Sequence, residues 1–356
     1  MVRRLGSYPT AWLLLLAYLL AAFFPALGRF LREVEFGKIH LFGQSLPLPL
    51  STVPLWIVLF CSGTVVSLEP ILHPVTPLTR ILAGFFATLL LPLVLLLSFR
   101  LLFAPWAKSD QIESLLLGLA IVIAMPIAGF STIWSERAGG NPALSLKLLF
   151  LSTLGSPLFA PWILEGVQGV VSGSYAADLQ KVAFHRIGIF LFVCVILPTF
   201  LGVLMRQFAQ GWILSRSKGI ELFEMGSLVL LCYSNATAAL PTIVRQKDLR
   251  FFLLVLVGTV AFCLFRFWMG HGIGVLLRLP QAGRRSLAFA SGMSNNGGGL
   301  VLASSVLFDH PRAIFVIVFY DLVQQVLGSV LYPGSRMGAT PKDLASNRDT
   351  RRESGA

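Results

Sequence analysis

Polar side chains that could bind an ion or a small molecule lie inside segments that are otherwise apolar. Asp321 stands between the runs FVIVFY and LVQQVL, and Asn295 and Asn296 lie in ASGMSNNGGGL at residues 290–300. Polar groups in hydrocarbon are unfavourable unless they find partners, and each glycine weakens a helix by about 1 kcal/mol relative to alanine. The stretch therefore predicts an interrupted helix, and the buried carboxylate predicts a cavity or a partner beside it.

A second interruption lies earlier in the chain, in AMPIAGFST at residues 124–132. Pro126, Gly129, Ser131 and Thr132 occur there within an apolar run. Irregular backbone at membrane depth is tolerated only where surrounding protein or a water-filled cavity provides hydrogen bonds for its polar groups. The two interruptions thus predict one interior site to which both contribute.

The elements that carry these groups are predicted to be membrane-spanning helices. The 356 residues are 56% hydrophobic and 12% charged, and the mean hydropathy is +0.79, which indicates an all-α polytopic membrane protein. With about 20 apolar residues per helix, ten spans are expected. They lie at 10–28, 50–68, 78–103, 112–134, 143–165, 184–206, 219–243, 250–277, 285–308 and 312–332.

Other function classes find little support. The net charge of +12 comes from connectors and from the tail at 333–356, without the basic stripe or aromatic platform of a nucleic-acid-binding protein. Hydrolase elbows, phosphate loops and metal-spaced histidines are missing from the sequence, so we expect no enzyme activity and no cofactor apart from a sodium ion. The four cysteines lie in apolar segments without CxxC spacing, which argues against disulfides and zinc.

The lysines and arginines favour a multi-pass protein of the plasma (inner) membrane with both termini in the cytoplasm. The first 28 residues also match a signal peptide; we interpret them as a retained first helix, with cleavage as the alternative. The connector at 166–183 is polar and rich in Gly and Ser, and the tail at 333–356 is expected to be disordered.

The halves of the chain are expected to be inverted repeats. Residues 1–165 hold spans one to five and residues 184–332 hold spans six to ten, so the interrupted spans four and nine occupy matching positions. Paired Gly/Pro-interrupted spans indicate a transporter with a central site. We expect the unwound regions Gly129–Thr132 and Ser294–Gly298 to cross near the membrane midplane.

Four motifs resemble those of the bile acid:sodium symporter superfamily. SLEP at 67–70 resembles the family's T-L-K-P. The stretch from Pro126 to Ser145 resembles its P-G-G-T-A-S-N followed by A-K-G-N-x-A-L-S. GMSNNGGGL resembles G-M-Q-N-S-G-L, and FYDLVQQVLGS resembles W-H-N-L-S-G-S. Together, in order and at these intervals, they favour membership of this superfamily.

The resemblance implies two sodium sites, and the chain departs from one of them. Ser131, Thr132 and Ser145 match positions that help hold a first sodium ion. The family's Glu before G-M-Q-N is Ala290 here, its Gln after Met is Ser294, and its Gln in span three is Ala87. Since a hard cation needs several oxygen ligands, the resemblance implies that the second site is absent or weakened, with Ser294 a poor replacement.

The expected activity is secondary transport of a small organic anion through the bilayer, coupled to sodium or protons. Thr132, Asn295 and Asn296 are expected to contact the anion beside helix N-termini, with Asn235 of span seven on the opposite wall. Burial favours the neutral form of a carboxyl group, so Asp321 could carry a proton or cation, or contact the substrate.

Structural alternatives remain open at this stage. Asp321 could be satisfied by an Asn or by Arg266, and Asn235 could serve an interhelical hydrogen bond. Arg266 and His271 could snorkel to the interface. A non-transporting sensor or scaffold that retains the fold is the alternative function.

Overall fold

The computed structural model describes residues 9–41, 44–66, 76–103, 109–183, 187–307 and 309–331. The SLEP motif, the start of the signal-like segment and the tail at 333–356 lie outside these ranges. The described chain is helical apart from one antiparallel hairpin, β1 (Glu35–Leu41) and β2 (Gln44–Pro49), in which Lys38 pairs with Pro47 and His40 with Ser45. This hairpin was not predicted; it occupies the connector after the first span.

Each predicted span corresponds to a helix or to consecutive helical segments. In chain order they are α2 (Pro9–Phe23) with α3 (Ala26–Glu33), α4 (Thr52–Val65), α6 (Leu78–Leu102), α7 (Asp110–Ala124) with α8 (Phe130–Arg137), α9 (Pro142–Gly166), α11 (Ile187–Leu191) with the π-helical η4 (Phe192–Ile196) and α12 (Leu197–Phe208), α14 (Ser217–Ala236) with α15 (Leu240–Gln246), α16 (Leu249–Leu276), α17 (Gln281–Gly292) with α18 (Asn296–Val306), and α19 (Pro311–Leu331).

Within the described residues, five helices are long and apolar enough to cross a membrane, or up to seven if each of two bent pairs counts as one span. The chain is thus mostly helical, with broken helices and several candidate spans; ten crossings remain a prediction. Two connectors between the predicted spans contain short helices. They are η2 (Gln168–Val170) and α10 (Gly173–Lys181) after α9, and α13 (Gln210–Ser215) after α12.

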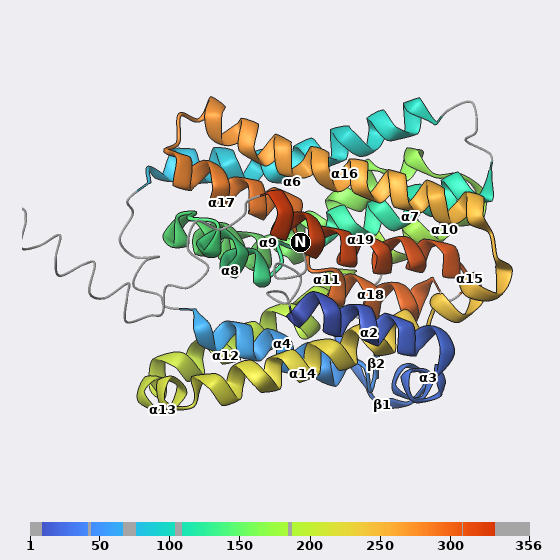
Figure 1. Ribbon diagram of the computed structural model, residues 1–356, viewed down its shortest axis with the longest axis horizontal. Coiled ribbons are helices and arrows are strands. Elements are labelled where there is room, and N and C mark those ends of the chain that lie inside the picture. Colours follow the sequence, from blue (N-terminus) through green and yellow to red (C-terminus); the bar gives the residue numbers. More distant parts are fainter. Residues whose placement is uncertain are drawn as a thin grey trace, which may run out of the picture.

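The helices form two layers (Figure 1). We call α2, α4, α12 and α14 the panel; in it, α4 packs on α12 and α14 packs on both α2 and α4. We call α6 to α9 and α16 to α19 the core, where α17 packs on α16 and α19 on α7. The panel lies along the lower side of the view, with the core above it. Any groove between the layers is lined by both.

The contacts of the two halves correspond. The packing of α4 on α12 has its counterpart in the packing of α14 on α2, and that of α6 on α9 in the packing of α16 on α19. The contact of α7 with α19 matches that of α17 with α9. This exchange is the pattern expected of two repeats, since each of these contacts converts into its counterpart when each span is replaced by the one five places along.

Two glycines allow α4 and α12 to approach closely. A Cβ atom on Gly63 would lie 2.3 Å from the Thr199 carbonyl oxygen, and one on Gly202 would lie 2.1 Å from the Phe60 carbonyl oxygen. Small residues at such a contact let helix backbones touch inside a membrane, where packing drives association. The panel therefore has a tight seam.

Replacing Gly202 with Ala is expected to destabilise the protein by about 1–3 kcal/mol or more, because the added methyl group must push the two backbones apart. The measurement is the thermal unfolding midpoint of purified protein together with the yield of monodisperse material. Gly226→Ala in α14 is the matched control, since a Cβ there meets nothing within 4 Å and alanine favours the helix. Equal midpoints for the two variants would contradict the seam.

Charged residues join helix ends on one side of the core. Arg312 of α19 pairs with Asp110 at 2.5 Å and Asp248 at 3.2 Å, at the starts of α7 and α16. Asp178 of α10 accepts hydrogen bonds from Lys181 at 2.7 Å and His310 at 3.0 Å. Partial burial alone would raise the pKa of Asp178, but these hydrogen bonds and charges hold the pKa below its usual range.

This lowered pKa predicts a small acid lability. An Asp with a depressed pKa in the folded state stabilises the protein above its unfolded pKa and loses that contribution as the pH falls through the folded value. Between about pH 5 and pH 3 the wild type should lose up to about 1 kcal/mol of stability, and Asp178→Asn should lose correspondingly less. Thermal unfolding against pH tests this, with the exposed Asp309→Asn as control; identical slopes for Asp178→Asn and wild type would be the contrary result.

Candidate functional site

The two interrupted spans meet at their breaks. Residues 125–129 separate α7 from α8, and residues 293–295 separate α17 from α18. An isolated antiparallel bridge pairs Ile127 with Ser294. Its hydrogen bonds run from the Ala128 N–H to the Met293 carbonyl at 3.1 Å and from the Asn295 N–H to the Pro126 carbonyl at 2.8 Å. The prediction that both spans are broken and that the breaks meet is confirmed.

The limits expected for the breaks were wrong. Pro126 disfavours helical backbone in the preceding residue, and α7 accordingly ends before Met125, which is extended. Ser131 and Thr132 belong to α8 instead of the break. In the second break the Asn295 side chain caps α18 by accepting from the Gly298 N–H at 3.2 Å, so the glycine run opens a helix.

Those glycines serve close packing. A Cβ atom on Gly297 would lie 3.1 Å from Leu231 of α14, and one on Gly299 would lie 3.0 Å from Met125. The first turn of α18 can therefore rest against both the end of α7 and the panel. A side chain at Gly297 or Gly299 would push α18 away from these neighbours.

Neighbouring helices satisfy the free backbone groups of the breaks. The Ile127 N–H donates to the Ser152 hydroxyl of α9 at 2.8 Å. In the other break the Ser294 N–H donates to Gln324 Oε1 at 3.0 Å, and Gln324 Nε2 donates to the Ser294 carbonyl at 3.2 Å. Gln324 thus replaces a missing backbone pairing with its side-chain amide, as irregular backbone in a membrane requires.

Asp321 lies directly beside the second break. Its side chain is buried, and it accepts hydrogen bonds from the Tyr18 hydroxyl of α2 at 2.9 Å and from Gln324 Nε2 at 3.0 Å. The Cys232 thiol of α14 is 3.8 Å away. The Asn296 amide lies next to the carboxylate, although neither of its polar atoms reaches a partner with good hydrogen-bond geometry. Asp321 therefore joins panel and core at the start of α18.

Arg266 is also buried, contrary to the expectation that it snorkels to the interface. Only 4% of the residue is exposed. Its Nη1 donates to the Ser294 hydroxyl at 2.9 Å and to the Tyr320 hydroxyl at 3.0 Å. Its position in the middle of α16 explains the error, because snorkelling requires a position near a helix end. In the described part of the chain it forms no ion pair with Asp321.

Two of the three residues of the predicted first sodium site, Thr132 and Ser145, have hydroxyls that form other hydrogen bonds. Thr132 Oγ1 donates to the Gly129 carbonyl at 2.8 Å in its own helical turn. Ser145 Oγ lies 2.8 Å from Ser135 Oγ, which lies 3.1 Å from Ser286 Oγ of α17. Ser131 is buried on α8. Hydrogen bonds among the three are not found in the ranges that the structure describes, and their role as ligands stays a prediction.

Two of the three positions that match the second site, Ala290 and Ala87, have apolar surroundings. Ala290 belongs to a buried cluster that includes Ile127, Leu148 and Leu287, and Ala87 packs against the same cluster. A sodium ion in such surroundings would lose its water without gaining oxygen ligands. The loss of a second sodium site nevertheless stays a prediction.

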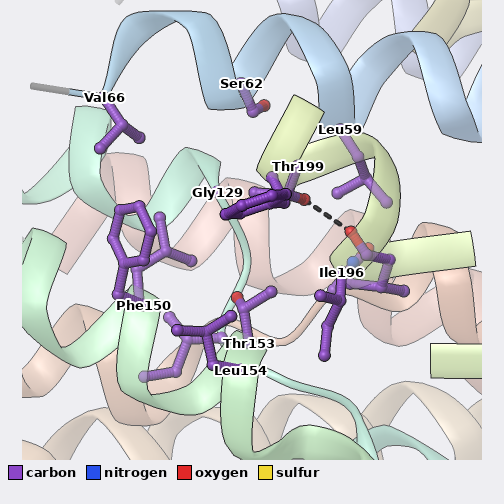
Figure 2. Close-up of a pocket in the computed structure, with 14 residues that line it drawn as sticks. Leu59, Ser62, Val66, Gly129, Phe150, Thr153, Leu154, Ile196 and Thr199 are labelled. Atoms are coloured by element: carbon purple, nitrogen blue, oxygen red, sulfur yellow. Dashed lines mark hydrogen bonds between the residues drawn. The ribbon is translucent and has the colours of Figure 1, made fainter. Parts of the chain in front are cut away.

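Two pockets lie between panel and core, and both are lined by Ser62, Gly129 and Asn295. The first encloses about 550 Å³, counting the space at its mouth. Figure 2 shows its walls of α4, α9 and α12 around Gly129, with Thr153 and Thr199 as further polar groups. It is otherwise apolar.

The second pocket reaches the breaks themselves. It is lined by Ser294 to Gly297 and by Asp321 and Gln324 from the core, with Leu228 and Leu231 from α14. Asn295 and Asn296 are thus placed at a pocket, as predicted. Thr132 lines neither pocket, and Asn235 is fully buried with its Nδ2 3.4 Å from the Gly297 carbonyl. The position of Asn235 fits the interhelical alternative, while its contact with a substrate remains a prediction.

Several residues near the pockets were missed in the sequence. Gln324 and Gln325 follow Asp321 at i+3 and i+4, on one face of a helix, which was a usable signal. Glu224 of α14 is buried and accepts from the Ser62 hydroxyl at 2.6 Å. A Cβ on Gly129 would be 3.2 Å from that hydroxyl oxygen. Ser62 thus connects a panel carboxylate with the start of α8, a link that no local pattern predicts.

Comparison with known proteins agrees with this geometry. Residues 52–244 match the Sodium Bile acid symporter family. The chain is 29% identical over 262 residues to the uncharacterized protein YbaS of Bacillus subtilis (strain 168), which covers 71% of this chain and 78% of that protein.

Two further relatives carry transporter names. One is the probable sodium/metabolite cotransporter BASS1, chloroplastic, of Oryza sativa subsp. japonica, 24% identical over 216 residues that cover 60% of this chain and 49% of that protein. The other is the uncharacterized sodium-dependent transporter YocS of Bacillus subtilis (strain 168), 22% identical over 203 residues, 56% of this chain and 59% of that protein. The chain thus spans about half the length of the first of these proteins and 59% of the second.

Proposed function

Because the chain belongs to the Sodium Bile acid symporter family, we propose that this multi-pass membrane protein is a secondary transporter of a small organic anion. The observation that carries the proposal is the meeting of two helix starts at a pocket. Gly129 precedes α8, Asn295 caps α18, and both residues line the two pockets between panel and core. Helix N-termini attract anions without a dedicated arginine.

In the proposed mechanism the anion sits between Gly129 and Asn295, with Asn296 in reach. Thr132 and Asn235 position the starts of α8 and α18 through their contacts with Gly129 and Gly297. The apolar walls from α4, α9 and α12 take the hydrophobic part of the substrate. Movement of the panel against the core then exposes the site alternately to the two sides, as inverted-repeat transporters do. The corresponding contacts of the two halves support repeats at 1–165 and 184–332 with the connector 166–183 between them.

The coupling ion is proposed to be sodium or a proton. The names of two relatives support sodium, with Ser131, Thr132 and Ser145 as its candidate ligands. The apolar surroundings of Ala290 and Ala87 support the loss of a second sodium site. Asp321, buried at the pocket, is the candidate proton carrier.

The deciding experiment is uptake of a panel of labelled carboxylates and sulfonates by proteoliposomes, with sodium and pH gradients imposed separately. Gradient-driven accumulation of at least one anion above that of protein-free vesicles is expected. Saturable binding of an anion without movement would instead identify a sensor that has retained the fold.

A further inference from the structure

We propose that the Arg266 guanidinium is a built-in cation of the crossing, held at the C-terminal end of α17 in the place where a transported cation would otherwise bind. The coupling consequence rests on the proposed function; the cation site itself does not. Packing alone does not explain why Arg266 is buried here, because a charge this deep in the protein needs compensation.

The geometry places the guanidinium at the end of the half-helix. Nη1 donates to Ser294 Oγ at 2.9 Å, inside the break, and to Tyr320 Oη at 3.0 Å. The Tyr320 hydroxyl in turn donates to the carbonyl of Gly292, the last residue of α17, at 3.3 Å. The guanidinium also lies over the Tyr320 ring, 5.8 Å from its centroid. Arg266 thus contacts Ser294 of the break and Tyr320, and Tyr320 in turn binds the last residue of α17.

The negative charge that compensates Arg266 comes from the end of α17 and not from an acidic side chain. No carboxylate within the described ranges lies within 4.0 Å of Arg266, and its Nε is buried without a hydrogen-bond partner. The free carbonyls at a helix C-terminus carry about half a negative charge. In transporters with broken helices, such half-helix C-termini and unwound carbonyls are where coupling cations are coordinated. Arg266 brings a permanent positive charge to that location.

The two breaks differ in this respect. At the second break, Arg266 faces the negative end of α17, while Asp321 lies beside Asn296 at the positive start of α18. The first break differs, because its own span holds no charged residue between Glu113 and Glu136 and the panel carboxylate Glu224 is linked to it through the Ser62 hydroxyl. Within the described ranges no lysine or arginine side chain is hydrogen-bonded to the first break, so a mobile cation is needed there and not at the second break. The transporter should use at most one coupling cation per cycle besides the tethered charge.

Chemical rescue tests the cation site on purified full-length protein in detergent. Arg266→Ala leaves a cavity without its charge, and we expect its unfolding midpoint to fall by several degrees. Guanidinium chloride at millimolar, non-denaturing concentrations should restore at least about 3 °C once the ion exceeds its dissociation constant about tenfold. Urea, which has the same shape without the charge, should not. Arg250→Ala, an exposed position on the same helix, is the matched control and should show no rescue.

Two results would overturn the proposal. One is equal rescue of Arg266→Ala by urea, or a guanidinium effect no larger than in Arg250→Ala. The other comes from the wild type and Arg266→Lys, which remain available if the alanine variant does not fold. For both proteins, the stabilisation by sodium chloride is compared with that by choline chloride at equal ionic strength. The dependence on sodium concentration should have a Hill coefficient of about 1, or the stabilisation should be absent. A coefficient near 2 would show two mobile sodium ions. Rescue without transport of any anion would leave the cation site standing and refute the proposed function.

Discussion

Uptake of the transported anion is expected to fall on the order of 100-fold in Asn295→Asp, with no loss of folded protein. Aspartate caps a helix as well as asparagine, so the bond to the Gly298 N–H can be kept. The new carboxylate, however, lies at both pockets beside the proposed anion. At about 5 Å and an effective dielectric constant of about 20, two like charges repel by roughly 3 kcal/mol.

Two companion variants separate the cap from the charge. Asn295→Ser keeps a capping oxygen without the charge and should retain most of the uptake. Asn295→Leu removes both cap and amide, and it should abolish uptake while the protein remains in the membrane with its stability lowered by about 1 kcal/mol. Transport is measured in proteoliposomes with equal protein content. Uptake by the Asp or Leu variant within a few-fold of wild type would refute a substrate contact at Asn295.

The second large effect is expected from Asp321→Asn. If Asp321 carries the coupling proton, the variant should lose uptake driven by a pH gradient by at least about tenfold, because an amide cannot bind and release a proton in this range. The groups that face Asp321 are Tyr18 of α2, Cys232 of α14, Asn296 of α18 and Gln324 of α19. None of these is a basic side chain, so the carboxylate is available to a proton.

Each gradient is applied alone to wild type and variant. Asparagine can still accept from Tyr18, so the fold around α2 should be kept, and any sodium-driven uptake should survive. Tyr18→Phe is the matched control, since it removes one hydrogen bond and leaves the carboxylate. Strict sodium dependence of the wild type, or full proton-driven uptake by Asp321→Asn, would be incompatible with this role.

The sequence was informative where local physics decides structure. Apolar length located the helices of the ten predicted spans, though not the short helices of the connectors, and Pro126 and the Asn-Gly run located both breaks. The exact ends of the breaks depended on caps: the Asn295 side chain turns a glycine run into a helix start. The β1–β2 hairpin was missed because a short mixed connector has no clear period.

The site was less predictable, because its contacts join distant parts of the chain. Tyr18 and Asp321 are 303 residues apart, and Ser62 and Glu224 are 162 apart. Single polar residues inside apolar helices identify candidates without naming partners. The prediction that Arg266 snorkels was wrong for this reason. An arginine side chain is long enough to reach a membrane interface, and only the fold shows that its guanidinium binds Ser294.

The π-helical segment η4 determines which face of α12 meets α4. A π-helical turn holds one residue more than an α-helical turn, and one residue corresponds to about 100° of rotation. The face of α12 that brings Gly202 against Gly63 thus depends on a single extra residue within Phe192–Ile196. A homologue that has lost it should show a one-residue gap here when aligned, and its glycine facing α4 should be displaced along α12 to match.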